Sequence, residues 1–167
     1  MDRRDLVVRR ARADDARRVA DFVNRALRGR VTIEPRTVMA RVGDVGFLLA
    51  EADHTLLGLL GWHVENLVAC VTDLLIWPAY ERQWVGQALL KEMESAALSL
   101  QAEVALLCLP PRLVPELVEY LEDSGYLLYT VKKLPRVWRE MAHRAGYEDE
   151  DEVPVKELRS HRVVRPL

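Results

Sequence analysis

The hydrophobic positions follow two periods along the chain, and each period predicts a class of secondary structure. At the N-terminus an apolar strand at 6–8 precedes a helix that Asp14 and Asp15 can cap at its start. A second, shorter helix covers roughly 36–42, and Pro35 suits its first turn. The first helix carries apolar residues at helical spacing, at Val19, Phe22, Val23 and Leu27.

The middle of the chain has the strand period. Three segments rich in Val, Leu, Ile and Thr are separated by short turn signals, which predicts an antiparallel meander; they cover 47–51, 55–64 and 67–77. Pro78 ends the third strand because it has no backbone N–H to donate. The pattern then predicts a helix, a buried strand, a helix and a last strand, at 85–98, 104–109, 113–121 and 126–134.

This order predicts an α/β domain (α+β by some schemes) at 1–134, with a mixed, mostly antiparallel sheet flanked by helices. The strand at 104–109 should run parallel to the third meander strand, because a helix links the two. Residues 135–167 change in character and predict a C-terminal helical and acidic extension. It holds a helix at 136–145 and five consecutive acidic residues at 148–152, a composition typical of a solvated loop.

Composition and charge narrow the functional classes. Half of the 167 residues are hydrophobic, as in ordinary globular proteins, and the net charge of −2 gives no general attraction to nucleic acid. The charge is uneven, because residues 1–41 hold twelve Arg against six acidic residues, a net +6 that leaves −8 for the remainder. Such an Arg-rich face could attract an acidic partner or a phosphorylated ligand, or could be the solvated side of the first helix.

The two cysteines argue against a disulfide or a metal framework. Cys70 and Cys108 both lie in apolar runs, with no CxxC partner and no histidine at ligand spacing. Buried free thiols suit a reducing compartment. The chain opens on no charged-then-apolar leader and has no apolar run of membrane-spanning length. We therefore expect a cytoplasmic protein with no metal and no membrane contact.

A resemblance to a known family rests on the order of elements and on one segment. The segment runs from Thr72 to Leu90 and reads TDLLIWPAYERQWVGQALL. Together they resemble the GCN5-related N-acetyltransferases (GNAT) over about residues 6–134. The resemblance implies that splayed central strands hold the pantetheine arm of acetyl-CoA, and that backbone N–H groups of the following loop bind its pyrophosphate. The cofactor-binding residues implied in this way are Leu74, Leu75, Ile76, Glu81, Arg82, Gln83, Trp84, Val85, Gly86, Gln87 and Ala88.

Several residues of this loop differ from the family pattern. An ungapped alignment matches the family proline, tyrosine, last glycine and paired leucines, at Pro78, Tyr80, Gly86, Leu89 and Leu90. Glu81 stands where the family has Arg, and Arg82 and Trp84 stand where it has Gly. Glu81 places a negative charge near a pyrophosphate and Trp84 adds bulk, whereas Arg82 and Gln83 can supply side-chain donors. Two alternatives stay open: acetyl-CoA binding through altered contacts, and loss of binding.

Acetyl transfer to an amine needs a base, an oxyanion donor and an acid for the leaving thiolate. The resemblance assigns the oxyanion to a backbone N–H of the central strand, at Ile76. It assigns the acid to a tyrosine on the last helix. Leu121 stands at that position. The adjacent Tyr120 is the candidate catalytic acid, and two alternatives stay open: a role for Tyr120 in the core, and water acting in place of a direct acid.

Candidate bases lie on the meander. Asp73 is on the third strand and could hold a water chain to the amine; a structural hydrogen bond is an equally open role for it. His63 and Glu65 share one strand face by the period of two and could form a polar pair. Glu51 is a further carboxylate in this region.

The leading hypothesis is an acetyl-CoA-dependent N-acetyltransferase that acts on a primary amine of a small molecule or peptide. The alternative is a catalytically inactive GNAT-fold module for binding or regulation that has lost normal CoA binding. A nucleic-acid binder is disfavoured, because the Arg-rich segment lacks interleaved aromatics and the rest of the chain is acidic. The C-terminal tail is expected to wrap around the domain or around the second subunit of a homodimer.

Overall fold

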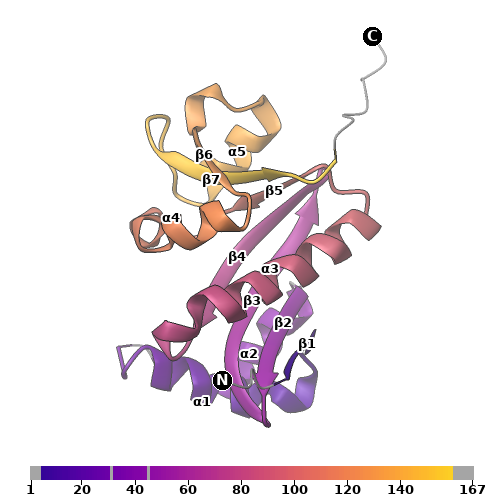
Figure 1. The fold of residues 1–167 in the computed structure, drawn as a ribbon, viewed down its shortest axis with the longest axis vertical. Helices are drawn as coiled ribbons and strands as arrows, with labels where there is room; N and C mark the ends of the chain where they lie inside the picture. The colour runs from indigo at the N-terminus through magenta and orange to yellow at the C-terminus, as the bar shows by residue number, and fades with distance from the viewer. Residues whose placement is uncertain (1–4, 31, 45, 160–167) are drawn as a thin grey trace. The chain divides into compact units, whose positions relative to one another are not determined.

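The computed structural model describes residues 5–30, 32–44 and 46–159 (Figure 1). These residues form a mixed α/β fold with a seven-stranded sheet in the order β1-β2-β3-β4-β5-β7-β6. The strands are β1 Leu6–Arg10, β2 Gly46–Ala52, β3 Thr55–Glu65, β4 Val68–Ile76, β5 Val104–Leu107, β6 Leu127–Thr130 and β7 Glu152–Glu157. The helices are α1 Ala16–Ala26, α2 Pro35–Asp44, α3 Arg82–Ser99, α4 Val114–Asp123 and α5 Arg136–Arg144. Short 3-10 turns precede α1, α3, α4 and α5, at η1 Ala13–Asp15, η2 Ala79–Glu81, η3 Pro111–Leu113 and η4 Val131–Lys133.

The strand directions agree with the predicted fold class. β2 pairs antiparallel with both β1 and β3, and β4 pairs parallel with β5. The mixed, mostly antiparallel sheet and its parallel central pair are therefore confirmed. The helix expected at 136–145 is also confirmed, as α5.

The sheet contains one strand that the sequence analysis did not predict. β7 lies between β5 and β6 and pairs antiparallel with both. Its side chains at Val153 and Val155 are buried, but Pro154 between them and the acidic residues before them hide the strand pattern. The acidic run is thus a loop only up to Asp151, and Glu152 begins the strand. The segment after Pro135 supplies an interior strand of the sheet.

The described residues divide into two compact units. Unit 1 comprises the described part of 1–62 together with 73–93. Its core packs α1 and α2 against β2 and β3, and the apolar stripe predicted for α1 faces this core. Val19, Phe22 and Val23 are buried there, and Leu27 is half-buried. Each such side chain contributes roughly 1.5–3 kcal/mol through removal from water.

A network of ion pairs joins β1, α1 and β2 in unit 1. The guanidinium of Arg9 donates to both oxygens of Asp15, at 2.8 and 2.7 Å, and to Glu51 at 2.5 Å. Arg18 binds the other oxygen of Glu51 at 2.7 Å. The hydrogen bonds from Arg9, with one at 2.7 Å from the backbone N–H of Arg12, lower the pKa of Asp15 to about 2. Glu51 therefore has a structural role in this network.

Unit 2 comprises 63–72 and the described residues from 94 onwards. Its core packs β4, β5 and β7 with α4 and α5, and Val68, Val104 and Val153 are fully buried in it. The hydroxyl of Tyr147 donates to the carbonyl of Leu109 at 2.6 Å. This bond ties the segment between α5 and β7 to the residues that follow β5.

Candidate functional site

The connection from β4 to α3 is the strand-loop-helix segment singled out in the sequence. β4 ends at Ile76, the Trp77–Pro78 peptide bond is cis, and η2 follows. The N–H of Glu81 donates to the carbonyl of Pro78 at 3.1 Å, and the N–H of Arg82 donates to the carbonyl of Ala79. α3 begins directly at Arg82. The chain therefore enters the helix through a single 3-10 turn.

The predicted cofactor-binding residues fall on three successive elements. Leu74–Ile76 lie on β4, Glu81 ends η2, and Arg82–Ala88 form the first two turns of α3. The first amides of a helix lack intrahelical partners and carry the positive end of the helix dipole, so this start of α3 can attract an anion. The amides of Glu81 and Arg82 are already bonded within the turn.

The predicted cofactor-binding residues within α3 differ in how far their side chains are buried. Val85 is fully buried and Gly86 is buried, whereas Gln83 is exposed and Trp84 is half-buried. The close packing of α3 depends on Gly58 of β3, where a Cβ would lie 2.7 Å from Cγ1 of Val85. Val85 can therefore reach a ligand only through its backbone.

The ladder between β4 and β5 is short. It pairs only Val68 to Val71 of β4, and the N–H of Cys108 donates to the carbonyl of Val71 at 2.8 Å. β4 continues to Ile76, beyond the last of these pairs. In unit 1, Leu75 packs against the core formed with α1 and α2. These β4 residues are the ones expected to hold the pantetheine arm.

Asp73, the candidate base, is held by an arginine from α2. Nη2 of Arg41 donates to Oδ2 of Asp73, and both side chains keep part of their surface in contact with solvent. The same carboxylate lies over Gly61 of β3, where a Cβ would lie 2.5 Å from Oδ2. An ionised carboxylate has several acceptor positions, so it can accept a further hydrogen bond from a water or an ammonium group. No local pattern points to Arg41, because its pair with Asp73 forms only in the folded chain.

Tyr120, the candidate acid, lies on α4 and is 8% exposed. Leu121, at the position of the family tyrosine, is also buried. The hydroxyl of Ser124 donates to the backbone carbonyl of Tyr120 at 3.1 Å, one turn along. This burial agrees with the alternative that Tyr120 has a role in the core. The hydroxyl of Tyr120, however, belongs to a polar region of unit 2.

That polar region joins α3, α4 and β7. Tyr126, in the short connection between α4 and β6, is 1% exposed, and burial raises its pKa, with Glu94 of α3 and Tyr120 adding to the effect. Nζ of Lys156 on β7 binds Glu94 and lies 5.7 Å from the centre of the Tyr126 ring. It also donates to the carbonyl of Ser124 at 2.9 Å. Glu94, Tyr126 and Lys156 are far apart along the chain, so no local sequence pattern predicts that they meet.

A cavity of about 190 Å³ in unit 2 adjoins the predicted polar pair of β3. Nε2 of His63 lies 3.9 Å from Oε2 of Glu65, and Arg144 of α5 donates to the same oxygen at 3.0 Å. Within the described residues, Nδ1 of His63 is buried and has no hydrogen-bond partner. The thiols of Cys70 and Cys108 meet here, and their hydrogen bond, together with burial, raises the pKa of Cys108. The cavity is lined by His63, Cys70, Thr72, Cys108, Met141, Arg144 and Ala145.

Two classes of feature are absent from the part of the chain that the structure describes. No group of three or more His, Cys, Asp or Glu side chains there could hold a metal ion. No helix there has both the length and the apolar character needed to cross a membrane.

Comparison with known proteins gives the fold. No protein-family model matches the chain, and no curated protein matches its sequence. A GNAT-family acetyltransferase from Staphylococcus aureus Mu50 is similar, with a TM-score of 0.68 and 11% identity over 93% of this chain and 100% of that one. The PaiA N-acetyltransferase of Thermoplasma acidophilum, in complex with coenzyme A, has a TM-score of 0.66 and 14% identity over 92% and 99% of the two chains. The ribosomal-protein-S18-alanine N-acetyltransferase of Escherichia coli has a TM-score of 0.66 and 12% identity over 98% and 100%. Because identities this low establish likeness of fold alone, the conclusion is that this chain has the fold of the GNAT acetyltransferases.

Proposed function

We propose that the protein is an N-acetyltransferase that moves the acetyl group of acetyl-CoA to a primary amine of a small molecule or peptide. The observation that carries the proposal is the β4–η2–α3 connection, which brings a strand end, a tight turn and a helix N-terminus together in unit 1. The similar structures support it, because all three are acetyltransferases and one is in complex with coenzyme A.

The residues at this connection fit an anionic group in charge and position. The start of α3 favours a phosphate through its dipole and its first amides. Arg82, half-buried at the first position of α3, adds a guanidinium that suits bidentate contact with phosphate oxygens. The negative charge of Glu81 reduces the positive electrostatic potential at the start of α3. Acetyl-CoA would supply the activated acetyl thioester, and the residues of this turn would hold the pyrophosphate of acetyl-CoA.

Two side chains are candidates for proton transfer. Asp73 would accept the proton of the acceptor amine, directly or through one water, while Arg41 keeps its carboxylate in place. Tyr120 would give a proton to the sulfur of the leaving thiolate. The backbone N–H of Ile76 would donate to the oxyanion.

Calorimetric titration with acetyl-CoA, followed by an assay of thiol release with a panel of amines, tests the proposal. Arg82→Glu should raise the Kd for acetyl-CoA by about 10-fold or more, because it exchanges a charge-assisted donor for a repelling carboxylate. Arg25→Glu, the same charge reversal at an exposed arginine on α1 of unit 1, is the control and should leave the Kd unchanged. Absence of binding at millimolar acetyl-CoA would reject the proposed function. An unchanged Kd in Arg82→Glu would show that the pyrophosphate does not bind at Arg82.

A non-catalytic GNAT-fold binding or regulatory module is the second candidate. It rests on one observation, that two of the amides expected to meet the pyrophosphate already bond within η2. Trp84 in the first turn of α3 adds bulk at the same place. This candidate expects no thiol release with any amine, whereas the leading proposal expects release that depends on both acetyl-CoA and the amine.

A further inference from the structure

The connection that follows α1 places an arginine over the indole of Trp77. Cζ of Arg28 lies 5.5 Å from the centre of the Trp77 ring, which is a cation–π contact. Both residues belong to unit 1. Trp77 comes directly after β4, and its N–H donates to the carbonyl of Leu57 on β3 at 3.0 Å, so the sheet fixes the position of the indole. A guanidinium that stacks on an aromatic face keeps its N–H donors at its edge, where an anion can accept them.

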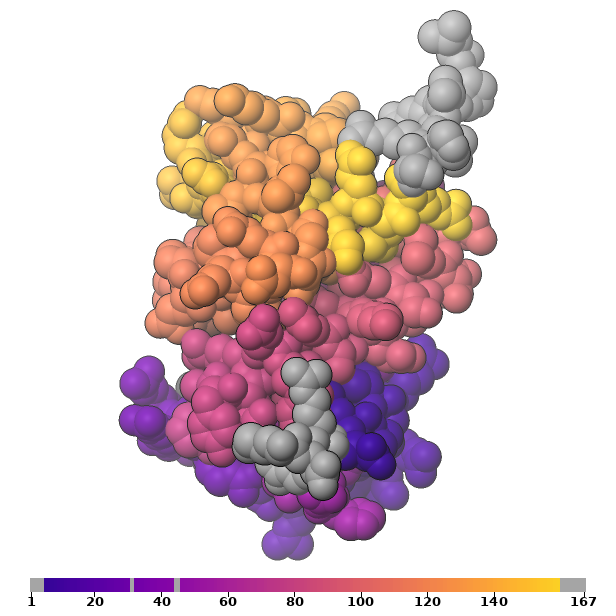
Figure 2. Space-filling view, viewed as in Figure 1, coloured from indigo at the N-terminus to yellow at the C-terminus, as the bar shows by residue number. Residues whose placement is uncertain are grey.

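The side chain of Asn24 on α1 closes the connection that carries Arg28. Its amide group donates to the carbonyl of Ile33 at 3.1 Å, and its amide oxygen accepts from the N–H of Ile33 at 2.8 Å. The N–H of Gly29 donates to the backbone carbonyl of Asn24 at 3.1 Å. Figure 2 shows the indigo and purple segments that include the end of α1 at the surface of the chain. Arg28 is therefore exposed to solvent, but the backbone that carries it is tied at both ends.

The positive charge of Arg28 has no carboxylate partner among residues 5–30, 32–44 and 46–159. Asp73 lies on the same face of the extended chain as Trp77, because an even number of positions separates them. The carboxylate of Asp73 is paired with Arg41, so the charges of these two side chains offset each other. Arg28 therefore leaves a net positive charge beside this chain. Four residues of extended chain span about 13 Å, which sets the separation between the proposed base and the charged group.

We propose that the acceptor of the acetyl group is an acidic amine, with its amine at Asp73 and a carboxylate or phosphate at Arg28. This inference rests on the proposed acetyltransferase function, whose acceptor it specifies. A tripeptide spans about 10 Å when it is extended, so a peptide with an acidic third residue has the required length. A small primary amine with a phosphate at the end of a chain of similar length presents the same chemistry. A cationic acceptor is repelled by the charge of Arg28.

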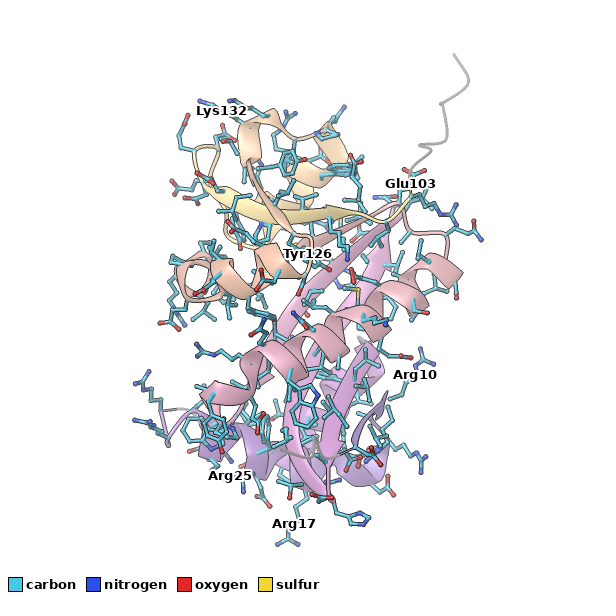
Figure 3. All side chains as sticks on the ribbon, in the orientation of Figure 1. Arg10, Arg17, Arg25, Glu103, Tyr126 and Lys132 are labelled. Carbon is cyan, nitrogen blue, oxygen red and sulfur yellow. The ribbon has the colours of Figure 1, made fainter. Side chains whose placement is uncertain are left out.

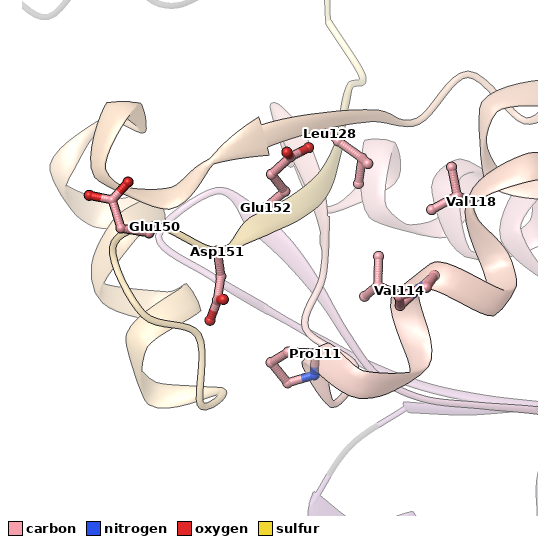
Figure 4. A pocket seen from close by; sticks show the side chains of 8 residues that line it. Pro111, Val114, Val118, Leu128, Glu150, Asp151 and Glu152 are labelled. Carbon is pink, nitrogen blue, oxygen red and sulfur yellow. The ribbon is translucent and has the colours of Figure 1, made fainter.

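The charge around Arg28 is opposite to that of a hollow in unit 2. This hollow, of about 370 Å³, is bordered by Glu150, Asp151 and Glu152. Figure 4 shows these three side chains across from the apolar residue Val118 of α4. Negative charges repel a carboxylate or a phosphate, so the border of this hollow disfavours an acidic group. The acidic group of the acceptor is therefore assigned to Arg28.

Matched acceptors test the inference in the assay of thiol release. The probes are the amidated tripeptides Ala-Ala-Glu, Ala-Ala-Gln and Ala-Ala-Arg, together with 6-aminohexyl phosphate and 6-aminohexanol. The glutamate peptide and the phosphate should each have a KM about 10-fold below that of the neutral analogue, the effect of one charge-assisted hydrogen bond. The kcat should stay the same, because this contact is equal in the ground state and the transition state. The two sets of probes distinguish a peptide acceptor from a phosphorylated small amine.

Variants of Arg28 test its role. Arg28→Glu should reverse the order, so that the arginine peptide has the lowest KM, and Arg28→Gln should remove the difference. Arg28→Lys keeps the charge without the planar fork of donors and should keep part of the preference. Arg17→Glu is the control and should keep the wild-type order, because Arg17 is an exposed arginine in the first turn of α1 (Figure 3). At about 0.15 M salt the Debye length is about half the length of α1, so a charge at position 17 is screened from Arg28.

Calorimetric titration of the three tripeptides, in the presence of coenzyme A, separates this inference from the proposed function. Tighter binding of the glutamate peptide that is lost in Arg28→Glu supports the recognition of an acidic group, even if no thiol is released and the acetyltransferase function is rejected. Thiol release with equal KM values for the three peptides, or an order unchanged in Arg28→Glu, would overturn the inference and leave the proposed function in place. Absence of both binding and thiol release with every probe would also overturn it.

Discussion

The carboxylate of Asp73 occupies the space that Gly61 leaves open on β3. A Cβ at position 61 would lie 2.5 Å from Oδ2 of Asp73 and 3.2 Å from its Cβ and Cγ. Glycine is thus required at this strand position by the approach of a neighbouring side chain, a common reason for glycine inside a strand. Arg41 binds the same carboxylate oxygen from α2. The three residues form one arrangement across β3, β4 and α2.

Gly61→Ala should disturb that arrangement. The added methyl group displaces the Asp73 carboxylate and should lower the free energy of unfolding by about 1–3 kcal/mol, the usual range for overpacking. Urea denaturation measures the loss. Gly43→Ala on α2 is the matched control, since a Cβ there meets nothing within 4 Å. In an Asp73→Ala background the penalty of Gly61→Ala should shrink, and an unchanged penalty would show that the carboxylate is not what requires glycine.

Asp73→Asn tests the proposed base. The amide keeps the size of the side chain but cannot accept the amine proton, so kcat/KM for acetyl transfer should fall about 10²-fold or more, with the Kd for acetyl-CoA unchanged. Glu65→Gln, a half-exposed carboxylate on β3, is the control. A wild-type rate in Asp73→Asn would leave Asp73 with the structural role alone.

The neighbouring tyrosines of unit 2 provide a matched pair of variants. Tyr120→Phe should lower kcat without changing the Kd for acetyl-CoA, because it removes the proposed proton donor. Tyr126→Phe should leave kcat unchanged. Within the described residues the hydroxyl of Tyr126 is buried without a hydrogen-bond partner, so its removal should keep or raise the free energy of unfolding, by up to about 1 kcal/mol. Equal rates in the two variants would assign Tyr120 to the core.

The Arg9–Asp15 pair makes the stability of unit 1 depend on pH. The pKa of Asp15 is about 2 in the folded chain, below its usual value of 3.8. A lowered pKa stabilises the fold above the unfolded value, and this stabilisation is lost as the pH falls from about 4 toward 2. Relative to pH 7, the loss should reach about 1 kcal/mol by pH 3.

Asp15→Asn isolates this contribution. Its free energy of unfolding, measured in urea at pH 7 and pH 3, should fall less with acid than that of the wild type. Asp14→Asn, an exposed neighbour in the same turn, should keep the wild-type pH dependence. If Asp15→Asn also kept it, other carboxylates would be responsible.

Local periodicity predicted the elements that lie within one stretch of chain. The stripe of α1 and the polar pair of His63 and Glu65 follow from spacing alone, and both are confirmed. The last predicted strand at 126–134 is shorter in the structure, because β6 ends at Thr130 and η4 follows. β7 escaped prediction because a proline and flanking charges mask its two buried valines.

Pairs that form only on folding could not be predicted from the sequence. Arg41 with Asp73, Cys70 with Cys108 and Glu94 with Lys156 each join residues from separate elements. No local pattern encodes such a contact, since it depends on the order and spacing of the strands. The loop residues from Glu81 onward were identified by resemblance, but the entry of the chain into α3 through η2 was not visible in their identities.

The environment of Lys156 has a consequence for chemical labelling. The chain has three other lysines, Lys91, Lys132 and Lys133, and all three are exposed. The amine of Lys156 is engaged by Glu94, by the carbonyl of Ser124 and by the face of Tyr126. An amine-reactive reagent can modify Lys156 only after these contacts break, whereas the exposed amines of Lys91 and Lys133 react without such an opening, and Lys132 is held by a single exposed pair with Glu150. The rate of acylation at Lys156, read by mass spectrometry, would therefore report how often this part of unit 2 opens.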